Sequence, residues 1–260
     1  MPARPDDLGG RRAVVTGSGA GVGRAIATHL ARAGAEVWIN DVALERAEAA
    51  VEAIRAEGGS AHPVVADVTD ADSVAAMAET TGPVDIVVNN AGTGVRAWAD
   101  GTRLVSFAES TPDDWEPLIR VNLVGVLHVT HAYVQGMVDR EWGRVLVIAS
   151  DAGRRGDRKQ AVYGAAKAGA MGFARGLAAE VGRAGVTVNC ISLGTMVHAS
   201  IGEAVAADPE LEARMAKPYP LGRLGRPDDV APLAVLLCSD AGAWITGQVY
   251  PVDGGYFPAL

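Results

Sequence analysis

Short runs of β-branched and apolar residues alternate along the chain with longer, alanine-rich segments. The short runs predict strands at residues 13–16, 36–40, 61–66, 84–88, 144–149, 186–191 and 248–252. The longer segments predict helices at residues 22–33, 43–57, 71–80, 112–140, 161–184, 199–216 and 227–237. Strands that alternate with helices form βαβ units, whose right-handed crossovers lay the strands parallel. This alternation constrains the fold more than any other feature of the sequence.

The composition suits such a fold. The chain has 260 residues, 49% of them hydrophobic, which is enough apolar material for a large buried core. Residues 84–88 are nearly all apolar, as expected of a strand that helices cover on both faces. No linker, repeat or low-complexity segment divides the chain. We therefore predict an α/β fold over residues 1–260: a single-domain, Rossmann-like, doubly wound parallel sheet of about seven strands with helices on both faces.

The charge and hydropathy of the chain exclude several classes of partner. A formal net charge of −8 argues against nucleic acid, because neutralising phosphates requires clustered Lys and Arg. No apolar run approaches the ~20 residues that a membrane-spanning helix needs. The opening residues, MPARPDDLGG, lack the apolar stretch of a signal peptide. We expect a cytoplasmic protein that acts on a small molecule, with no membrane or nucleic-acid partner.

Cysteine and histidine are too sparse for a metal site. Cys190 and Cys238 are enough for one disulfide, but we expect both to be reduced, buried thiols. Two cysteines are also too few for a zinc site built from cysteine pairs. His128 and His131 lie three residues apart in a predicted helix without an evident third ligand, so we expect them in an interface or the core. No metal is predicted.

A glycine-rich turn joins the first predicted strand to the first predicted helix. Its spacing is Gly17-x-x-x-Gly21-x-Gly23. Glycines let the backbone approach a ligand closely, and a helix N-terminus offers free N–H groups and partial positive charge that suit a pyrophosphate. A glycine turn alone is weak evidence. The order strand, glycine turn, helix, strand and acid is stronger, and it predicts a dinucleotide site.

Asp41 is the acid in that order, 18 residues after Gly23 at the end of the second predicted strand. A carboxylate at this place accepts hydrogen bonds from a ribose hydroxyl and repels a 2′-phosphate. No Arg or Lys stands at Ser18, Gly19, Ala20 or Val42 to offset it. NAD is therefore favoured over NADP. The alternative is that Asp41 is a solvated cap for the helix that follows.

Tyr163 and Lys167 are four residues apart in a predicted helix and so share one helix face. A nearby ammonium favours the phenolate form of a tyrosine, so we expect Lys167 to lower the pKa of Tyr163 toward the range of a general acid or base. The alternative is an ordinary surface pair. Ser150 ends the fifth predicted strand, at the sheet edge where parallel α/β folds bind ligands, and its hydroxyl suits a substrate oxygen.

These motifs together resemble the short-chain dehydrogenase/reductase superfamily over about residues 10–255. The matching segments appear in the family's order: TGSGAGVG at the cofactor turn, Asp67-Val68, the NNAG of residues 89–92, Asn122, Ser150, the Tyr163/Lys167 pair, Asn189, and the C-terminal ITGQ and VDGG. The ordered set is far more specific than any one match.

The resemblance implies a nicotinamide-dependent alcohol dehydrogenase or ketoreductase. Its catalytic residues would be Asn122, Ser150, Tyr163 and Lys167. Its cofactor-binding residues would be Gly17, Ser18, Gly21, Val22, Gly23, Asp41, Asp67, Val68, Asn89, Ala91, Gly92, Tyr163, Lys167, Gly194 and Thr195. It also implies a homotetramer. Substrates suggested by the segment around Ser150 and Tyr163 are hydroxyacyl-thioesters or cyclic alcohols.

The chain departs from the family pattern after the sixth predicted strand. Leu193 replaces a proline, and His198 stands where a threonine anchors the carboxamide; Thr195 or Ser200 would substitute. The segment 93–115 is longer than usual and would line the substrate site or form a surface loop. Residues 195–217 have few apolar anchors and are expected to form a substrate lid.

A basic stretch, residues 154–159, lies between Ser150 and Tyr163 and either attracts an anionic substrate or forms an ordinary surface turn. The leading hypothesis is an NAD-dependent oxidoreductase that transfers hydride between nicotinamide and a secondary alcohol or ketone. The alternative is a dinucleotide-binding scaffold or sensor without turnover.

Overall fold

The computed structural model describes residues 6–93, 106–197 and 199–258. Within them, one parallel sheet has the strand order β3-β2-β1-β4-β5-β6-β7. Its strands are β1 (Arg12–Val15), β2 (Glu36–Asp41), β3 (Ser60–Val65), β4 (Ile86–Asn89), β5 (Gly143–Ser150), β6 (Val186–Leu193) and β7 (Val249–Val252). Each predicted strand is present, within two residues at either end. The predicted single-domain, doubly wound α/β fold is confirmed.

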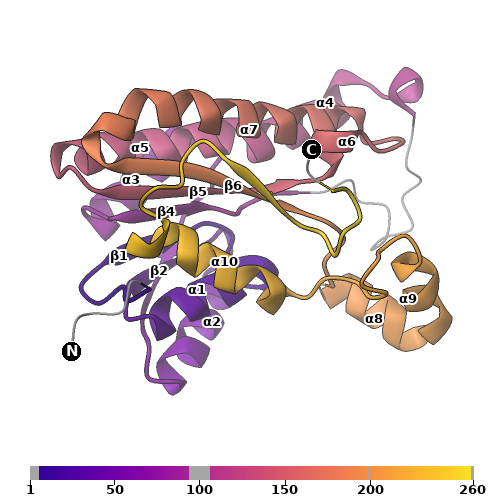
Figure 1. The fold of residues 1–260 in the computed structure, drawn as a ribbon, viewed down its shortest axis with the longest axis horizontal. Coiled ribbons are helices and arrows are strands. Elements are labelled where there is room, and N and C mark those ends of the chain that lie inside the picture. Colours follow the sequence, from indigo (N-terminus) through magenta and orange to yellow (C-terminus); the bar gives the residue numbers. More distant parts are fainter. Residues whose placement is uncertain (1–5, 94–105, 198, 259–260) are drawn as a thin grey trace.

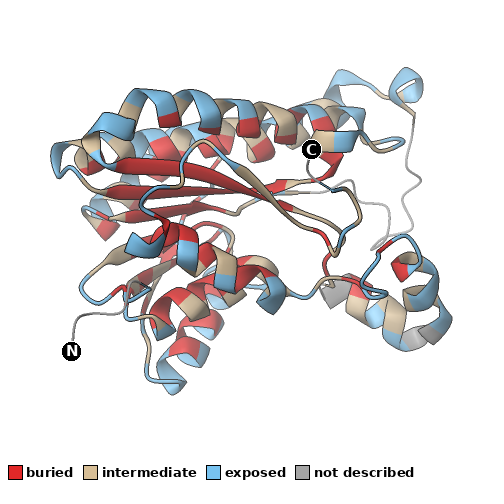
Figure 2. Cartoon of the chain, in the orientation of Figure 1, coloured by how far each residue is buried: buried red, intermediate tan, exposed pale blue. Residues whose placement is uncertain are grey.

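Helices cover both faces of the sheet (Figure 1). One layer contains α1 (Gly21–Arg32), α2 (Leu44–Ala56) and α10 (Pro227–Cys238), and the other contains α3 (Ala71–Thr81), α5 (Gly125–Asp139) and α7 (Ala161–Val181). Each layer packs its buried face on the sheet as a separate apolar cluster. Figure 2 shows the consequence: the central strands are buried almost throughout, and the helices are buried only on their inner faces.

The predicted helix 112–140 is not continuous. It consists of α4 (Pro112–Ile119), a π-helical turn at Arg120–Val124, and α5. Asn122 lies in the π turn, fully buried, and its Nδ2 donates to the carbonyl oxygens of Leu118 and Thr93 at 2.9 and 2.8 Å. These bonds tie the turn to the loop after β4, and π turns of this kind often mark functional positions.

The predicted helix 199–216 is also divided, into α8 (Ala199–Ala207) and α9 (Pro209–Ala216). Asp208 separates them because a residue before proline disfavours the helical conformation. Its side chain instead accepts the backbone N–H of Glu210 at 3.0 Å and caps α9. The two helices lie beyond the carboxyl end of the sheet, apart from the helical layers (Figure 1).

Strand order creates the opening for a ligand. The chain runs from β1 outward to β3 and then returns to place β4 on the other side of β1. The connections after β1 and β4 therefore part in opposite directions, which leaves a crevice at the carboxyl ends of these strands. The glycine turn follows β1, and the NNAG segment follows β4.

Candidate active site

The glycine turn is packed too tightly for any side chain at two of its positions. A Cβ on Gly17, where φ is +60°, would lie 2.8 Å from the Cα of Ala91. A Cβ on Gly23 would lie 2.7 Å from the carbonyl oxygen of Gly17. The turn is therefore pressed against the NNAG segment, and its backbone lines the crevice. Ser18 contributes backbone only, because its hydroxyl is buried and donates to the carbonyl oxygen of Val15 at 2.6 Å.

Asn90 and Thr16 hold the turn in place; both lie in the matching segments NNAG and TGSGAGVG, but neither was among the predicted site residues. Asn90 Nδ2 donates to the carbonyl oxygens of Thr16 and Gly17 at 2.9 and 3.0 Å. Thr16 Oγ1 accepts the N–H groups of Asn90 and Ala91, both at 3.0 Å. The predicted Asn89 is buried in the sheet instead, where its Nδ2 donates to Thr130 Oγ1 at 2.9 Å. The signal for Asn90 was its place beside Asn89 at the crevice.

Asp41 lies at the crevice but is not alone there. Its Oδ1 accepts the N–H of Ala43 at 3.1 Å and two guanidinium N–H groups of Arg46, at 3.1 and 2.5 Å. These bonds hold the pKa of Asp41 below its usual range although burial raises it. Asp41 is thus a helix cap and a crevice residue at once. The expectation that no basic residue offsets its charge is wrong, because the first turn of α2 returns Arg46 to it.

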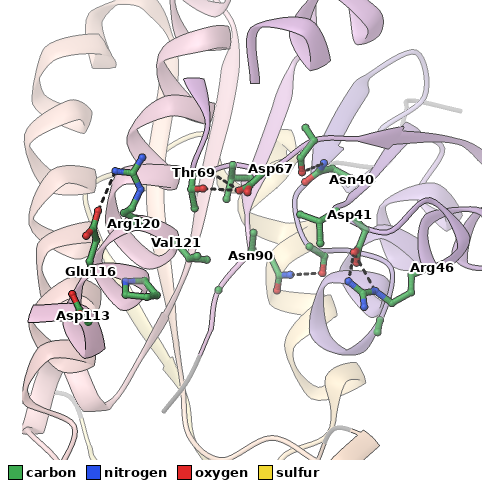
Figure 3. A pocket seen from close by; sticks show the side chains of 18 residues that line it. Asn40, Asp41, Arg46, Asp67, Thr69, Asn90, Asp113, Glu116, Arg120 and Val121 are labelled. Atoms are coloured by element: carbon green, nitrogen blue, oxygen red, sulfur yellow. Dashed lines mark hydrogen bonds and ion pairs between the residues drawn. The ribbon is translucent and has the colours of Figure 1, made fainter. Parts of the chain in front are cut away.

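A cavity of about 800 Å³ extends from this point across the end of the sheet. Asp67 and Val68 line it as predicted; Asp67 Oδ1 accepts both the N–H and the hydroxyl of Thr69 at 2.8 Å. Figure 3 shows Asp41 with Arg46 on one wall and Arg120 with Glu116, from the region of α4, on the opposite wall. The cavity's volume and the polar side chains on its walls suit the adenosine half of a dinucleotide.

A second cavity, of about 380 Å³, adjoins the first, and Asn90 and Gly92 line both. Ser150, Tyr163, Lys167 and Asn122 all line it. The four predicted catalytic residues, which come from β5, α7 and the π turn, are therefore brought together at one place. A ligand that begins in the larger cavity reaches them without leaving the crevice.

Ser150 and Tyr163 form a hydrogen-bonded pair. Ser150 Oγ accepts the N–H of Ala152 at 3.2 Å. Burial raises the pKa of the Tyr163 phenol, and its hydrogen bond with Ser150 partly opposes that rise. The expectation that Lys167 lowers this pKa is not met in the structure, because burial outweighs any effect of the ammonium. The phenol is therefore held in its protonated form.

Lys167 is buried deeply enough to lose part of its affinity for a proton. It is 6% exposed, its Nζ donates to the carbonyl oxygen of Ile148 at 2.9 Å, and burial lowers its pKa to about 8. A Cβ on Gly92 would meet Asn122 Oδ1 at 2.9 Å and Lys167 Nζ at 3.3 Å, so both atoms face the same glycine. Asn122 Oδ1 is buried and has no hydrogen-bond donor among the described residues. It suits a water that bridges to Lys167.

Comparisons with known proteins agree with this geometry. A family model described as Enoyl-(Acyl carrier protein) reductase matches residues 17–257. The chain is 38% identical over 255 residues to the acetoacetyl-CoA reductase of Shinella zoogloeoides, which covers 95% of this chain and 98% of the relative. It is 38% identical over 250 residues to the (2S)-[(R)-hydroxy(phenyl)methyl]succinyl-CoA dehydrogenase subunit BbsD of Thauera aromatica, covering 94% and 96%.

A solved structure shows the same likeness in three dimensions. The gluconate 5-dehydrogenase from Burkholderia cenocepacia, in complex with NADP and tartrate, matches with a TM-score of 0.88 at 33% identity over 100% of both chains. The chain belongs to the short-chain dehydrogenase/reductase superfamily. As a member of this superfamily it is a nicotinamide-dependent oxidoreductase of the alcohol dehydrogenase or ketoreductase type.

This superfamily member replaces the usual proline with Leu193, and the segment that follows is held by a tyrosine. Tyr219 accepts the N–H of Thr195 at 2.9 Å and donates its hydroxyl to Thr195 Oγ1 at 2.8 Å. Gly194 and Thr195 line the smaller cavity as expected. His198 and the side chain of Ser200 lie outside the described residues. So do residues 94–105, the main part of the lengthened segment 93–115.

The start of the basic stretch 154–159 is neutralised. Arg154 Nη1 lies 3.0 Å from Asp151 Oδ1, and Arg155 Nε lies 3.3 Å from Asp157 Oδ1. These pairs leave little positive charge from α6 (Ala152–Arg155) to attract an anionic substrate. Arg158 and Lys159 are exposed.

The remaining expectations concern cysteine, histidine and the membrane. Cys190 and Cys238 are free and buried, as predicted. His128 Nδ1 lies 3.1 Å from the carbonyl oxygen of Val68, between α5 and the loop after β3. In the described part of the chain, no three His, Cys, Asp or Glu side chains gather as metal ligands. No helix there has the length and apolar character to cross a membrane.

Proposed function

We propose that this protein is an NAD-preferring dehydrogenase/ketoreductase that interconverts a secondary alcohol and a ketone, with Ser150, Tyr163, Lys167 and Asn122 as its catalytic residues. The observation that carries the proposal is the gathering of Ser150, Tyr163, Lys167 and Asn122 around one cavity that adjoins the larger cavity. When bound, the nicotinamide ring supplies or accepts the hydride.

The site residues fit a dinucleotide on their own chemistry. The glycine turn leads into the N-terminus of α1, where free backbone N–H groups suit a pyrophosphate, and Gly17 and Ala20 line the larger cavity. The residues that would hold the cofactor are Gly17, Ser18, Gly21, Val22, Gly23, Asp41, Asp67, Val68, Ala91, Gly92, Gly194 and Thr195, with Asn90 in place of Asn89.

The chain's own residues would handle the proton. Ser150 Oγ already accepts a backbone N–H, so its hydroxyl hydrogen is free to be donated to a carbonyl oxygen. Tyr163, protonated at neutral pH, would give its proton to the same oxygen as the carbonyl is reduced. Lys167 would bind the nicotinamide ribose and, through a water at Asn122 Oδ1, return a proton to the tyrosine.

We propose a hydroxyacyl- or ketoacyl-thioester as the substrate class. The smaller cavity is lined by polar groups such as Ser150 and Gln160 and by apolar groups on Val197, Ile201 and the rings of Tyr219 and Tyr256. The apolar part of this lining suits an acyl chain. The relatives from Shinella and Thauera are named for CoA thioesters, whereas the Burkholderia enzyme is named for gluconate.

The preference for NAD rests on Asp41. Its carboxylate lies at the end of β2 beside Gly19. A ribose hydroxyl would donate a hydrogen bond to it there, whereas a 2′-phosphate would be repelled by its negative charge. Arg46 weakens this discrimination by pairing with Asp41. We therefore expect a modest preference for NAD, and we expect Arg46→Gln to strengthen it and Asp41→Ala to reverse it. A wild type that uses NADPH better than NADH would refute this part of the proposal.

Turnover is the test of the whole proposal. NADH oxidation with acetoacetyl-CoA, followed by nicotinamide absorbance, is expected for the wild type. Tyr163→Phe removes the proton donor but keeps the ring, so we expect at least a thousandfold lower kcat with unchanged NADH binding, on the order expected for loss of a general acid. Nucleotide binding without turnover on any alcohol or ketone in a broad panel would favour a scaffold or sensor instead.

Three further features belong to the proposal. Residues 195–217 would form a lid, because Ile201, Tyr219 and Leu224 make a small apolar cluster separate from the main core. The chain would assemble as a homotetramer in the cytoplasm; Trp244, 99% exposed, is one apolar side chain that a second copy would cover. Light scattering of the purified protein would test the assembly.

A further inference from the structure

A buried cluster of charged side chains next to the catalytic serine joins three segments that are distant in sequence. Asp151 follows Ser150 and is 2% exposed. Its Oδ1 accepts hydrogen bonds from Ser192 Oγ of β6 at 2.6 Å and from Arg154 Nη1 of α6 at 3.0 Å. Asp253, just after β7, is 7% exposed and lies 4.0 Å from the same guanidinium nitrogen. The cluster therefore connects β5, β6 and the C-terminal segment.

The charges in this cluster do not balance. Two carboxyl groups face one guanidinium, because Arg155 of α6 pairs with Asp157. From α7, Lys167 points instead to the Ile148 carbonyl oxygen, and the facing group of β6 is the neutral hydroxyl of Ser192. Two adjacent buried carboxylates with a single cation favour retention of one proton between them.

In the part of the chain that the structure describes, the hydrogen bonds leave one carboxyl oxygen of the two aspartates without a partner. Both oxygens of Asp253 already accept backbone N–H groups, Oδ1 from Gly255 at 2.9 Å and Oδ2 from Phe257 at 3.0 Å. Oδ2 of Asp151 is buried and has no hydrogen-bond donor among the described residues. Burial raises the pKa of Asp151, Ser192 opposes the rise, and Asp253 raises the pKa further through its charge and a hydrogen bond. The proton belongs on Asp151 Oδ2.

The cluster anchors a wall of the substrate cavity. Asp253 folds the C-terminal segment back on itself through Gly255 and Phe257, and Arg154 lies 4.9 Å over the Phe257 ring. Tyr256, which lies between Gly255 and Phe257 in the chain, stacks on Tyr219 with their ring centroids 4.7 Å apart. Both rings line the cavity that contains Tyr163. Because Tyr219 also holds Thr195, movement of the C-terminal segment would disturb the substrate wall and the segment after β6 together.

We propose that Asp151, Arg154 and Asp253 form a carboxyl latch, in which one proton shared by the two aspartates fixes residues 253–257 as a wall of the substrate cavity. Asp151 is a positioning residue in this scheme, since it acts through the C-terminal segment. The assignment of the cavity to substrate rests on the proposed function; the latch itself does not.

Two asparagine substitutions distinguish this latch from a plain ion pair. In Asp151→Asn, Oδ1 still accepts from Ser192 and Arg154, and the amide N–H replaces the shared proton toward Asp253. In Asp253→Asn, an amide group replaces an oxygen that accepts a backbone N–H. We expect Asp151→Asn to keep the KM for acetoacetyl-CoA within about twofold of wild type, and Asp253→Asn and Asp151→Ala to raise it about tenfold or more with little change in kcat or NADH affinity.

Hydrogen exchange tests the latch without any turnover. The amides of Gly255 and Phe257 are expected to exchange about tenfold faster in Asp253→Asn and Asp151→Ala than in the wild type, and at the wild-type rate in Asp151→Asn. Asp85→Asn is the matched control. Asp85 accepts the Arg12 N–H at 3.0 Å and faces Arg140 at the opposite end of the sheet, so its loss should lower Tm without changing exchange at 255 and 257.

The dependence of Tm on pH gives a second independent readout. A carboxyl group whose pKa is raised by folding stabilises the fold at low pH and loses that contribution as pH rises through its folded pKa. The Tm of wild type should therefore fall relative to that of Asp151→Asn as the pH rises above 3.8, the ordinary pKa of an aspartate. Equal pH profiles, or fast exchange in Asp151→Asn as in Asp151→Ala, would overturn the latch. Lack of turnover on every alcohol and ketone tested would overturn only the proposed function, because exchange and Tm still decide the latch.

Discussion

Replacing Gly23 with alanine perturbs the glycine turn at the point where it touches itself. The new Cβ would meet Asn90 Nδ2 and lie 2.7 Å from the Gly17 carbonyl oxygen, 0.7 Å closer than the 3.4 Å at which ordinary contact begins. Its third neighbour is the Cα of Ser18 at 2.9 Å, so the backbone itself must move. The residue that yields first is Asn90, whose amide ties the turn to the end of β4.

The cost follows from these contacts. Overpacking against backbone costs ~1–3 kcal/mol. Loss of the two Asn90 hydrogen bonds adds roughly 0.5–1.5 kcal/mol each. The free energy of unfolding should fall by ~2–6 kcal/mol in total, which lowers Tm by roughly 4–24 °C for a chain of this size. Because the displaced backbone faces the pyrophosphate site, the Kd for NADH should rise at least about tenfold.

Differential scanning fluorimetry and a titration of NADH fluorescence measure the two effects. Gly58→Ala is the control: Gly58 has φ of +86° but no atom within 4 Å of its Cβ position, and it lies between α2 and β3. It should cost only the ~1–2 kcal/mol of a left-handed alanine and leave NADH affinity unchanged. If Gly23→Ala matched Gly58→Ala in both measurements, the close packing of the turn would not be what shapes the nucleotide site.

Two further substitutions separate stability from activity. Lys167 has a pKa of about 8 in the fold, below the 10.5 of a free lysine, so its buried charge opposes folding below pH 8 and the penalty disappears between pH 8 and 10.5. Lys167→Met should therefore abolish turnover yet raise the free energy of unfolding at pH 7 by ~1–3 kcal/mol. This gain should shrink toward pH 10 in Tm measurements. A lower free energy of unfolding at pH 7 would contradict the burial argument. Arg144→Met should do the reverse. Arg144 is 3% exposed and donates to the carbonyl oxygens of Gly143, Gly185 and Ser239, far from the crevice. The free energy of unfolding should therefore fall by about 2–4 kcal/mol and Tm by several degrees, while kcat and KM stay unchanged.

The sequence predicted the succession of strands along the chain, the glycine turn, and the spacing of Tyr163 from Lys167. Each of these features depends on residues within a few positions of one another. A strand depends on its apolar run, a turn depends on its glycines, and a shared helix face depends on a four-residue spacing. The division of helix 112–140 was not readable, since Asn122 makes its π turn by bonding to Thr93 as well as to its own helix.

The electrostatics of the site were decided by tertiary structure. Arg46 reaches Asp41 through the first turn of α2, and Arg154 meets Asp253, 99 positions later in the chain, only because β5, β6 and β7 are neighbours in the sheet. The same burial that raises the pKa of Tyr163 lowers that of Lys167. The sequence alone placed Ser150, Tyr163 and Lys167 at this crevice, because local periodicity puts Ser150 at a strand end and the other two on one helix face. Which of those groups carry a charge depends on what the fold packs around them, because solvent exclusion and neighbouring ions set the free energy of ionisation.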